Sequence, residues 1–279
     1  MTGPSSNPEA DVQAETPQAG LAAVVLAAGA GRRLRPLTEL RPKALCTVDN
    51  VPLVDLAIGR ARQVTEAVAV NVHHGRAQLE AYLAGRVHVS LEEPEALETA
   101  GALGHLRSWI DSRDVLVVNV DVWHPEQLSG FARDWDRERV RLLVVHDPER
   151  GDFGDLRYAG VALLPWAVVR QLSPRRHGLY PAVLGPAVAE GWAEFVTSPR
   201  PFFDCGTPPE YLAANLTAAG GSNVVGEGAV VEGEIVRSVV WAHARVERGE
   251  RLIEAIRAPE GITVQTRLPH PLPRLQANR

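Results

Sequence analysis

The chain has 279 residues, of which 45% are hydrophobic and 23% charged, and its formal net charge is −5. This length suits one main domain with an appendage, and the mild acidity argues against a nucleic-acid partner, which needs a basic surface. No apolar run approaches the length of a membrane span, so we expect no membrane partner. Because Cys46 and Cys205 match no zinc or redox spacing, a reducing, cytoplasmic location is expected.

The two ends of the chain lack the patterns of folded elements. The first twenty residues are rich in Pro, Ser, Glu and Ala, without apolar periodicity and without the regions of a secretory signal. We therefore predict a disordered tail over 1–20 and a flexible C-terminus over 269–279.

Apolar runs alternate with helical patterns in the first half of the chain. The patterns predict strands over 21–28, 66–74, 86–93 and 114–123, and helices over 51–64, 75–85 and 98–110. Strand candidates at 139–147, 158–165 and 194–198 continue the series, interleaved with helices. This succession predicts an α/β fold, with a Rossmann-like, mostly parallel sheet and helices on both faces, over 21–219.

The pattern changes after residue 220. Apolar residues arrive there in short pairs, separated by glycines and charged residues, and helical periodicity is lost. A short β-solenoid over 220–268 is the favoured interpretation, and a small meander or hairpin pair is the alternative. An apolar solenoid face with an open end also indicates association into a homo-oligomer.

The first predicted strand opens into a basic loop. Gly29 and Gly31 expose backbone N–H groups to a phosphate, Arg33 can grip phosphate oxygens bidentately, and Lys43 adds a point charge. A dinucleotide loop is excluded because Leu34 stands at the third glycine, and a Walker A loop because the lysine lies too far on. A solvated loop without a ligand is the remaining alternative, and the downstream Pro-Lys pair argues against it.

The run from 26 to 43, LAAGAGRRLRPLT followed by PK, resembles the signature of the sugar-1-phosphate nucleotidylyltransferases. It departs from that signature at Arg32, where Thr or Ser is usual. The segments LETAGAL at 97–103, NVD at 119–121 and FFDCGTPPEYLAAN at 202–215 resemble further family elements in the same order. The C-terminal segment resembles the left-handed β-helix fragment of mannose-1-phosphate guanylyltransferases.

The resemblance implies transfer of a nucleotidyl group from a nucleoside triphosphate to a sugar 1-phosphate, with Mg²⁺ as cofactor. Asp121 follows a buried strand and Asp204 precedes a Gly-Thr-Pro turn, where either aspartate alone is more often a cap or turn residue. By resemblance these two aspartates bind the metal, and Arg33 and Lys43 are catalytic. The implied nucleotide-binding residues are Leu26, Ala28, Gly29, Gly31, Arg33, Thr99, Ala100 and Gly101, and the implied sugar-binding residues are Asn119 and Gly160.

The substrate signals disagree. The C-terminal segment favours GTP and mannose 1-phosphate, which is the first expectation. Guanylyltransferases usually carry Gly at the position of Glu98. This glutamate and the run 70–83 resemble uridylyltransferases that act on N-acetylmuramate 1-phosphate. Synthesis of a UDP-sugar from this or another hexose 1-phosphate is therefore the alternative. Val120 replaces a family Gly and a Glu-Lys-Pro segment is missing, which leaves a non-catalytic regulatory protein that binds nucleotide sugars as a further alternative.

Overall fold

The computed structural model describes residues 20–269 and 272–273. The predicted tail at 1–20 and the predicted flexible end at 269–279 therefore lie outside the described residues, apart from residues 20, 269, 272 and 273. The disorder expected at both ends stays a prediction.

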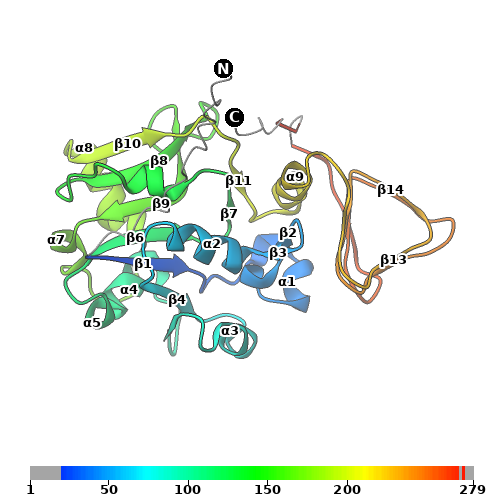
Figure 1. Ribbon diagram of the computed structural model, residues 1–279, viewed down its shortest axis with the longest axis horizontal. Helices are drawn as coiled ribbons and strands as arrows, with labels where there is room; N and C mark the ends of the chain where they lie inside the picture. Colours follow the sequence, from blue (N-terminus) through cyan, green and yellow to red (C-terminus); the bar gives the residue numbers. More distant parts are fainter. Residues whose placement is uncertain (1–19, 270–271, 274–279) are drawn as a thin grey trace, which may run out of the picture.

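A seven-stranded sheet forms the centre of the main body, in the order β10-β8-β9-β6-β1-β4-β5 (Figure 1). Its pairs are parallel except for those of β9, which runs antiparallel to β6 and β8. The mostly parallel sheet expected from the sequence is confirmed. The strands are β1 (Leu21–Leu26), β4 (Val68–Val72), β5 (His88–Leu91), β6 (Asp114–Asn119), β8 (Val140–His146), β9 (Leu156–Leu164) and β10 (Ala193–Thr197).

Helices cover both faces of this sheet, as predicted. Because successive side chains of a strand point to opposite faces, β1 contributes Ala23 and Val25 to one buried cluster and Val24 and Leu26 to the other. The first cluster includes α2 (Leu53–Arg62), α3 (Arg76–Leu83) and α9 (Pro208–Ala218). The second includes α4 (Glu98–His105), α5 (Arg107–Ile110), α7 (Trp166–Val169), the π-helix η3 (Tyr180–Leu184) and α8 (Gly185–Ala189).

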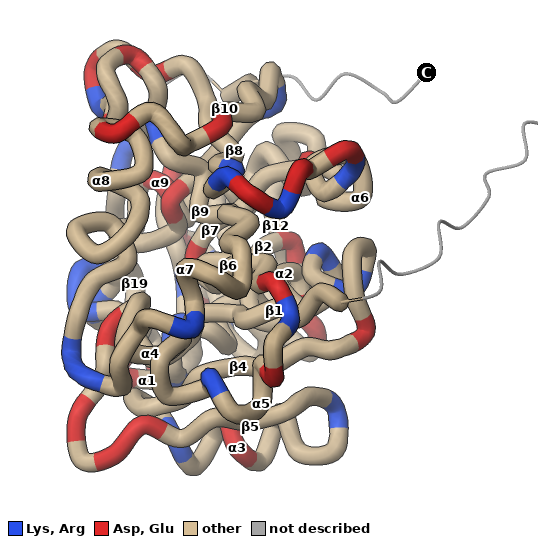
Figure 2. The backbone as a smooth tube through the Cα atoms, turned by 90° about the vertical axis from the view of Figure 1, so that its left-hand side faces the viewer, with Lys and Arg blue, Asp and Glu red and all other residues tan. Residues whose placement is uncertain are grey.

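Short elements connect the sheet to its surroundings. The chain between β1 and α2 forms the 3₁₀ turns η1 (Arg32–Leu34) and η2 (Lys43–Leu45), the helical turn α1 (Leu37–Leu40), and the antiparallel pair β2 (Thr47–Val48) and β3 (Val51–Pro52). After β6 come β7 (Val122–Trp123) and α6 (Leu128–Ala132), and β7 pairs with β11 (Phe203–Asp204). Seen from the side, acidic and basic residues are interspersed along the backbone (Figure 2).

The C-terminal strands stack into coils beside α9 (Figure 1). Val224 pairs in parallel with Val239, and Val239 with Ile256, and the other two sides of the coil are parallel pairs as well. Parallel stacking is the arrangement of a solenoid rather than of hairpins, although β19 runs antiparallel to β18. The left-handed sense of the coil stays a prediction. The strands are β12 (Val224–Val225), β13 (Val230–Val231), β14 (Glu234–Val236), β15 (Val239–Val240), β16 (Arg245–Val246), β17 (Arg251–Ile253), β18 (Ala255–Arg257) and β19 (Thr263–Gln265).

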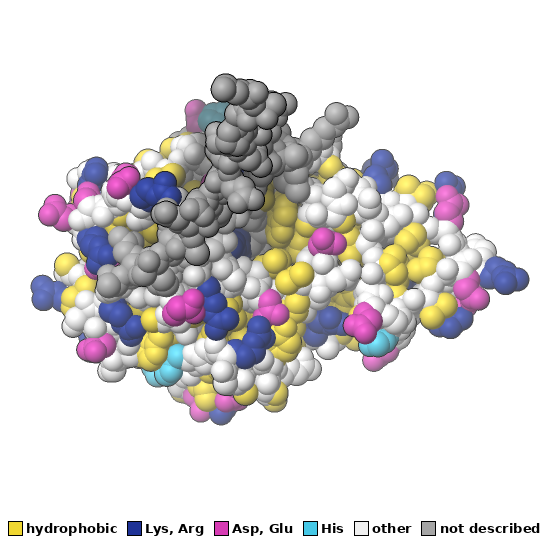
Figure 3. Space-filling model, in the orientation of Figure 1, with side chains coloured by type: hydrophobic (Ala, Val, Ile, Leu, Met, Phe, Trp, Pro, Cys, Tyr) yellow, Lys and Arg dark blue, Asp and Glu magenta, His cyan; other side chains and the backbone are white. Residues whose placement is uncertain are grey.

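A buried polar contact joins the coils to the main body. The indole N–H of Trp241 donates to the Tyr211 hydroxyl at 3.1 Å, and this hydroxyl donates to the Thr47 carbonyl at 2.5 Å. Hydrophobic side chains also lie along the junction between the main body and the coils (Figure 3). Among the residues described, no helix is long and apolar enough to cross a lipid bilayer.

Candidate active site

The glycine loop after β1 folds back on the segment that carries Lys43. Gly31 has a φ of +62°, and a Cβ atom there would lie 2.9 Å from Lys43 Cβ and 2.9 Å from Thr38 Cγ2. Both the backbone conformation and the close approach therefore require glycine at this position. The Thr38 hydroxyl donates to the Gly31 carbonyl at 3.0 Å and holds the loop in place. Within residues 20–269, the N–H groups of Gly29, Ala30 and Gly31 donate to no protein acceptor, so they are available to an anion.

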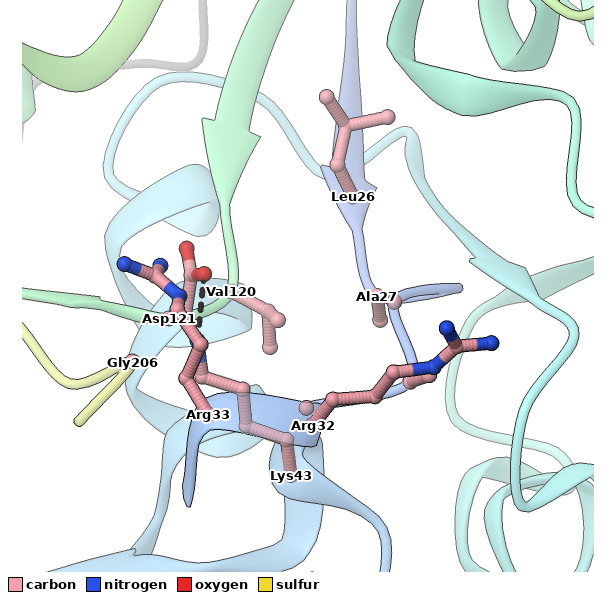
Figure 4. A pocket seen from close by; sticks show the side chains of 11 residues that line it. Leu26, Ala27, Arg32, Arg33, Lys43, Val120, Asp121 and Gly206 are labelled. Atoms are coloured by element: carbon pink, nitrogen blue, oxygen red, sulfur yellow. Dashed lines mark hydrogen bonds and ion pairs between the residues drawn. The ribbon is translucent and has the colours of Figure 1, made fainter. Parts of the chain in front are cut away.

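Two ion pairs join this loop to the two predicted metal-binding aspartates. The ammonium of Lys43, whose side chain is only 9% exposed, lies 2.6 Å from Asp121 Oδ2 (Figure 4). Arg33, whose side chain is 67% exposed, lies 3.4 Å from Asp204 Oδ2. The other oxygen of Asp204 accepts the Gly206 N–H at 2.9 Å. The structure thus brings together the four charged residues that the sequence singled out.

The pairing of β7 with β11 places the two aspartates side by side. Asp121 stands between β6 and β7, and Asp204 is paired with Val122 in the antiparallel β7–β11 ladder. The Cys205 N–H donates to the Asp121 carbonyl at 2.8 Å and extends this ladder. Carboxylates from distant parts of the sequence therefore meet at the end of the central strand, where an open α/β sheet places its ligands.

A cavity of about 350 Å³ lies between the glycine loop on one side and Val120, Asp121 and Gly206 on the other (Figure 4). The predicted nucleotide-binding residues Leu26, Gly29 and Gly31 line this cavity, together with the catalytic candidates. Val120, the replacement for the family glycine, lines it too, and its branched side chain takes space beside Asp121. Ala28 is not among the lining residues, and its carbonyl oxygen lies 2.9 Å from Nδ1 of His74.

The predicted base-contacting residues lie at the start of α4 and outside this lining. The N–H groups of Ala100 and Gly101 donate to the His177 carbonyl at 2.9 and 3.2 Å, and the Thr99 hydroxyl accepts the Leu179 N–H at 2.6 Å. A Cβ atom on Gly101 would lie 2.3 Å from the Arg175 carbonyl oxygen. The small residues therefore allow a close approach of the 175–179 backbone, and their contact with a base stays a prediction.

The predicted sugar-binding residues face each other across β6 and β9. A Cβ atom on Gly160, whose φ is +72°, would lie 3.1 Å from Asn119 Cβ and 2.6 Å from Val122 Cγ2. Glycine is thus required where β9 passes the end of β6. The two residues are neighbours at the edge that carries Asp121, and their role toward a sugar stays a prediction.

A buried polar network behind the glycine loop was not predicted from the sequence. The Asn71 side-chain oxygen accepts the Ala27 N–H at 2.7 Å, and its NH₂ group donates to Glu92 Oε1 at 2.7 Å. The other oxygen of Glu92 accepts the Leu97 N–H at 2.7 Å. This network fixes the start of the loop to the segment that precedes α4. In the sequence, the feature that could have indicated this network is Asn71, a polar residue inside the apolar run 68–72.

A buried cation beneath Asp121 was not predicted either. Arg60, 7% exposed on α2, donates to the Val122 carbonyl at 2.8 Å, while its Nε has no acceptor in the described structure. Burial lowers the pKa of Arg60 to about 10, so the guanidinium keeps its charge at neutral pH. Burial and the charge of Arg60 together hold the pKa of His124 well below 6.5. Burial also raises the pKa of Cys205, which lies among these charges as a neutral thiol.

Residues 23–227 match the family model of the MobA-like NTP transferase domain. The chain belongs to this family. The resemblance to nucleotidyltransferases noted in the sequence is therefore confirmed at the level of the family.

Curated relatives agree with this assignment. An N-acetylmuramate α-1-phosphate uridylyltransferase from Caulobacter vibrioides is 38% identical over 141 residues, which are 46% of this chain and 58% of the relative. The chain thus spans little more than half of that relative's length. A protein of the same name from Neisseria meningitidis serogroup B is 36% identical over 160 residues, 53% of this chain and 67% of the relative.

Solved structures show the same fold. A crystal structure from Thermus thermophilus, described as a mannose-1-phosphate geranyltransferase, superposes with a TM-score of 0.66 and 18% identity. The match covers 88% of this chain and 95% of that one. Residues 20–219 alone cannot supply this coverage, so the likeness extends into the C-terminal coils.

Proposed function

We propose that the protein transfers a nucleotidyl group from a nucleoside triphosphate to a sugar 1-phosphate and releases pyrophosphate. We base this proposal on the meeting of Arg33, Lys43 and Asp121 at one cavity beside the glycine loop, with Asp204 paired to Arg33. Membership of the NTP transferase family and the names of the curated relatives support it.

The side chains of the cavity suit a reaction between crowded anions. A phosphate oxygen of the sugar 1-phosphate attacks the α-phosphorus, the bond from that phosphorus to the bridging oxygen breaks, and pyrophosphate leaves with the electron pair. Such a reaction needs alignment and charge compensation more than proton transfer. Lys43 is held rigidly by Asp121 and supplies a fixed positive charge, whereas the exposed Arg33 is held loosely and can turn from Asp204 to a phosphate.

The two aspartates fit a magnesium ion. Mg²⁺ prefers oxygen ligands and is commonly held by one or two carboxylates with water and substrate phosphates. Asp121 keeps one oxygen without a hydrogen bond in the described structure, and both carboxylates already attract cationic groups. Asp121 and Asp204 are therefore the ligands we propose for this ion. Bound there, Mg²⁺ would neutralise phosphate charge.

The curated relatives favour uridine. We propose UTP and N-acetylmuramate 1-phosphate, or another hexose 1-phosphate, as substrates, in preference to GTP and mannose 1-phosphate. The likeness to the T. thermophilus structure supports the fold alone. Glu98 has a φ of +59°, a conformation in which glycine is unstrained, so the glycine usual in guanylyltransferases would fit the same backbone. At this position the chain therefore differs from guanylyltransferases in the side chain and not in the backbone. The Glu98 carboxylate is paired with Arg176 at 2.8 Å.

Pyrophosphate release tests the proposal. The assay, with magnesium, combines UTP, GTP, dTTP, ATP and CTP with the 1-phosphates of N-acetylmuramate, N-acetylglucosamine, glucose and mannose. We expect the highest kcat/KM with UTP and N-acetylmuramate 1-phosphate. Preference for GTP and mannose 1-phosphate would reverse the substrate assignment. Absence of turnover, with nucleotide sugars still raising the melting temperature, would favour the non-catalytic regulatory protein, in which Val120 obstructs the site. A cytoplasmic location and self-association are further proposals.

A further inference from the structure

A second cavity, of about 460 Å³, adjoins the first across the glycine loop. The two cavities share Gly29, Ala30, Arg32 and Lys43 as lining residues. The remaining walls of the second cavity come from the segments 35–42 and 74–78. The loop whose N–H groups lack protein acceptors therefore separates two spaces, of which the proposed reaction uses one.

The second cavity carries an excess of positive charge. One acidic side chain, Glu39, lines it, and the basic side chains that line it are Arg32, Arg35, Arg41, Lys43 and Arg76. Arg76 is paired with Glu80 at 2.7 Å, and Arg35 lies 3.7 Å from Glu39. In contrast, Arg32 and Arg41 have no acidic partner among the described residues. Two guanidinium charges thus remain uncompensated at this cavity.

These two arginines are held in different ways. The guanidinium of Arg41 stacks over the Trp241 ring, 4.2 Å from its centroid, so the C-terminal coils fix it in place. Arg32 and Arg33 are consecutive in η1, and their side chains diverge: Arg33 extends toward Asp121, and Arg32 extends away from it (Figure 4). Arg32 is therefore placed to meet an anion that crosses the loop from the first cavity.

We propose that the second cavity binds the pyrophosphate that leaves the first, with Arg32 as its principal ligand. This inference rests on the proposed function. Cleavage of the bond between the α-phosphorus and the bridging oxygen leaves several negative charges on pyrophosphate, while Lys43 and Arg33 are drawn back to their aspartates. The arginines of the second cavity that lack acidic partners among the residues described, Arg32 and Arg41, then offer uncompensated positive charge on the other side of the loop. Arg32, the residue that departs from the family signature, thereby binds the product.

Binding of inorganic pyrophosphate, measured by calorimetry on the full chain in EDTA, tests this site without turnover. We expect Arg32→Thr, which restores the signature residue, to weaken binding about tenfold, as the loss of one charge-assisted contact implies. Arg32→Lys should retain most of the affinity. Arg248→Thr, at an exposed arginine in the C-terminal coils, is the matched control for a lost charge and should bind as wild type. In the forward reaction, Arg32→Thr should raise the inhibition constant of pyrophosphate about tenfold and leave the KM for sugar 1-phosphate unchanged.

The neighbouring arginine decides which cavity holds the anion. If Arg33→Thr weakens pyrophosphate binding more than Arg32→Thr does, pyrophosphate rests in the first cavity and the inference is wrong. It is also wrong if Arg32→Thr binds as wild type, or if Arg248→Thr loses as much affinity as Arg32→Thr. If pyrophosphate binding depends on Arg32 but the protein shows no turnover, the anion site is supported and the proposed function fails. Failure of the anion site and failure of the proposed function are therefore distinguishable.

Discussion

Replacing Asp121 by Asn separates the structural and chemical roles of the Lys43–Asp121 pair. The Lys43 side chain is 9% exposed and that of Asp121 33%, so the variant leaves a nearly buried ammonium beside a neutral amide. Removing one partner of a fully buried ion pair costs about 3–5 kcal/mol. Because Asp121 is one-third exposed, water compensates part of this loss, and we expect a destabilisation of about 2 kcal/mol.

Asp204→Asn is the matched control. Its partner Arg33 is 67% exposed and lies 3.4 Å away, so this pair contributes little stability, and we expect a loss below about 1 kcal/mol. The amide oxygen can still accept the Gly206 N–H. If both aspartates hold the metal, however, each variant should lose at least about a hundredfold in kcat. The same change of charge then gives a large loss of activity in both variants but unequal losses of stability.

Thermal unfolding and pyrophosphate release measure the two effects. A destabilisation of about 2 kcal/mol lowers the melting temperature of a domain of this size by about 4–8 °C, so Asp121→Asn is readily distinguished from Asp204→Asn. The double variant Lys43→Met/Asp121→Asn buries no charge at this pair and should recover most of the stability while remaining inactive. A melting temperature of Asp121→Asn equal to that of wild type would refute the buried pair. Wild-type turnover by either single variant would refute the metal assignment.

Three further perturbations test the packing around the site. Gly31→Ala meets both a φ of +62° and contacts at 2.9 Å, so it should cost more than Gly85→Ala, which has a φ of +72° in open space, and chemical denaturation compares the two. Tyr211→Phe leaves the Trp241 N–H and the Thr47 carbonyl without partners and should cost about 1–3 kcal/mol. Tyr82→Phe removes a hydrogen bond to Asp55 at the surface, where water can replace it, and should cost less than about 1 kcal/mol; equal melting temperatures would contradict this. The pKa of His124 is depressed in the fold, so below pH 6.5 the unfolded chain binds a proton that the folded chain does not, and stability should fall by up to about 1.4 kcal/mol per pH unit. Urea unfolding at pH 7.5 and 5.5 should show a smaller loss for His124→Asn than for wild type.

The sheet was predictable because its strands are buried in regular apolar runs. The errors fall where long-range pairing interrupts a local pattern. The run 114–123 reads as one strand, yet β6 ends at Asn119 and β7 is a separate strand, because the antiparallel partner of β7 comes from residues 203–204. The helix predicted over 98–110 is divided at Leu106 into α4 and α5. The helix predicted from residue 51 begins at Leu53, because Val51–Pro52 pairs with Thr47–Val48.

The site residues were predictable by type but not by partner. Glycines and cations in the loop form a local motif, whereas the pairing of Lys43 with Asp121 depends on the β7–β11 ladder. Arg60, in contrast, could not be predicted as a residue of the site. Its position in the helical pattern is ordinary for a charged residue, and only the packing of α2 beneath β7 buries it against the Val122 carbonyl.

The charged residues around the first cavity do not by themselves compensate the negative charge of a bound triphosphate. The charges of Arg33, Lys43, Asp121 and Asp204 sum to zero before a substrate enters, and Arg32, which lines both cavities, and buried Arg60 each add one positive charge. A triphosphate and a sugar phosphate bring a large negative charge, which must be compensated in a space with restricted access to water. Under the proposed function, Asp121 and Asp204 would hold a divalent cation, which would supply positive charge there and leave Lys43 and Arg33 free to contact phosphate. Arg32, which lines both cavities, is placed to add positive charge on either side of the glycine loop.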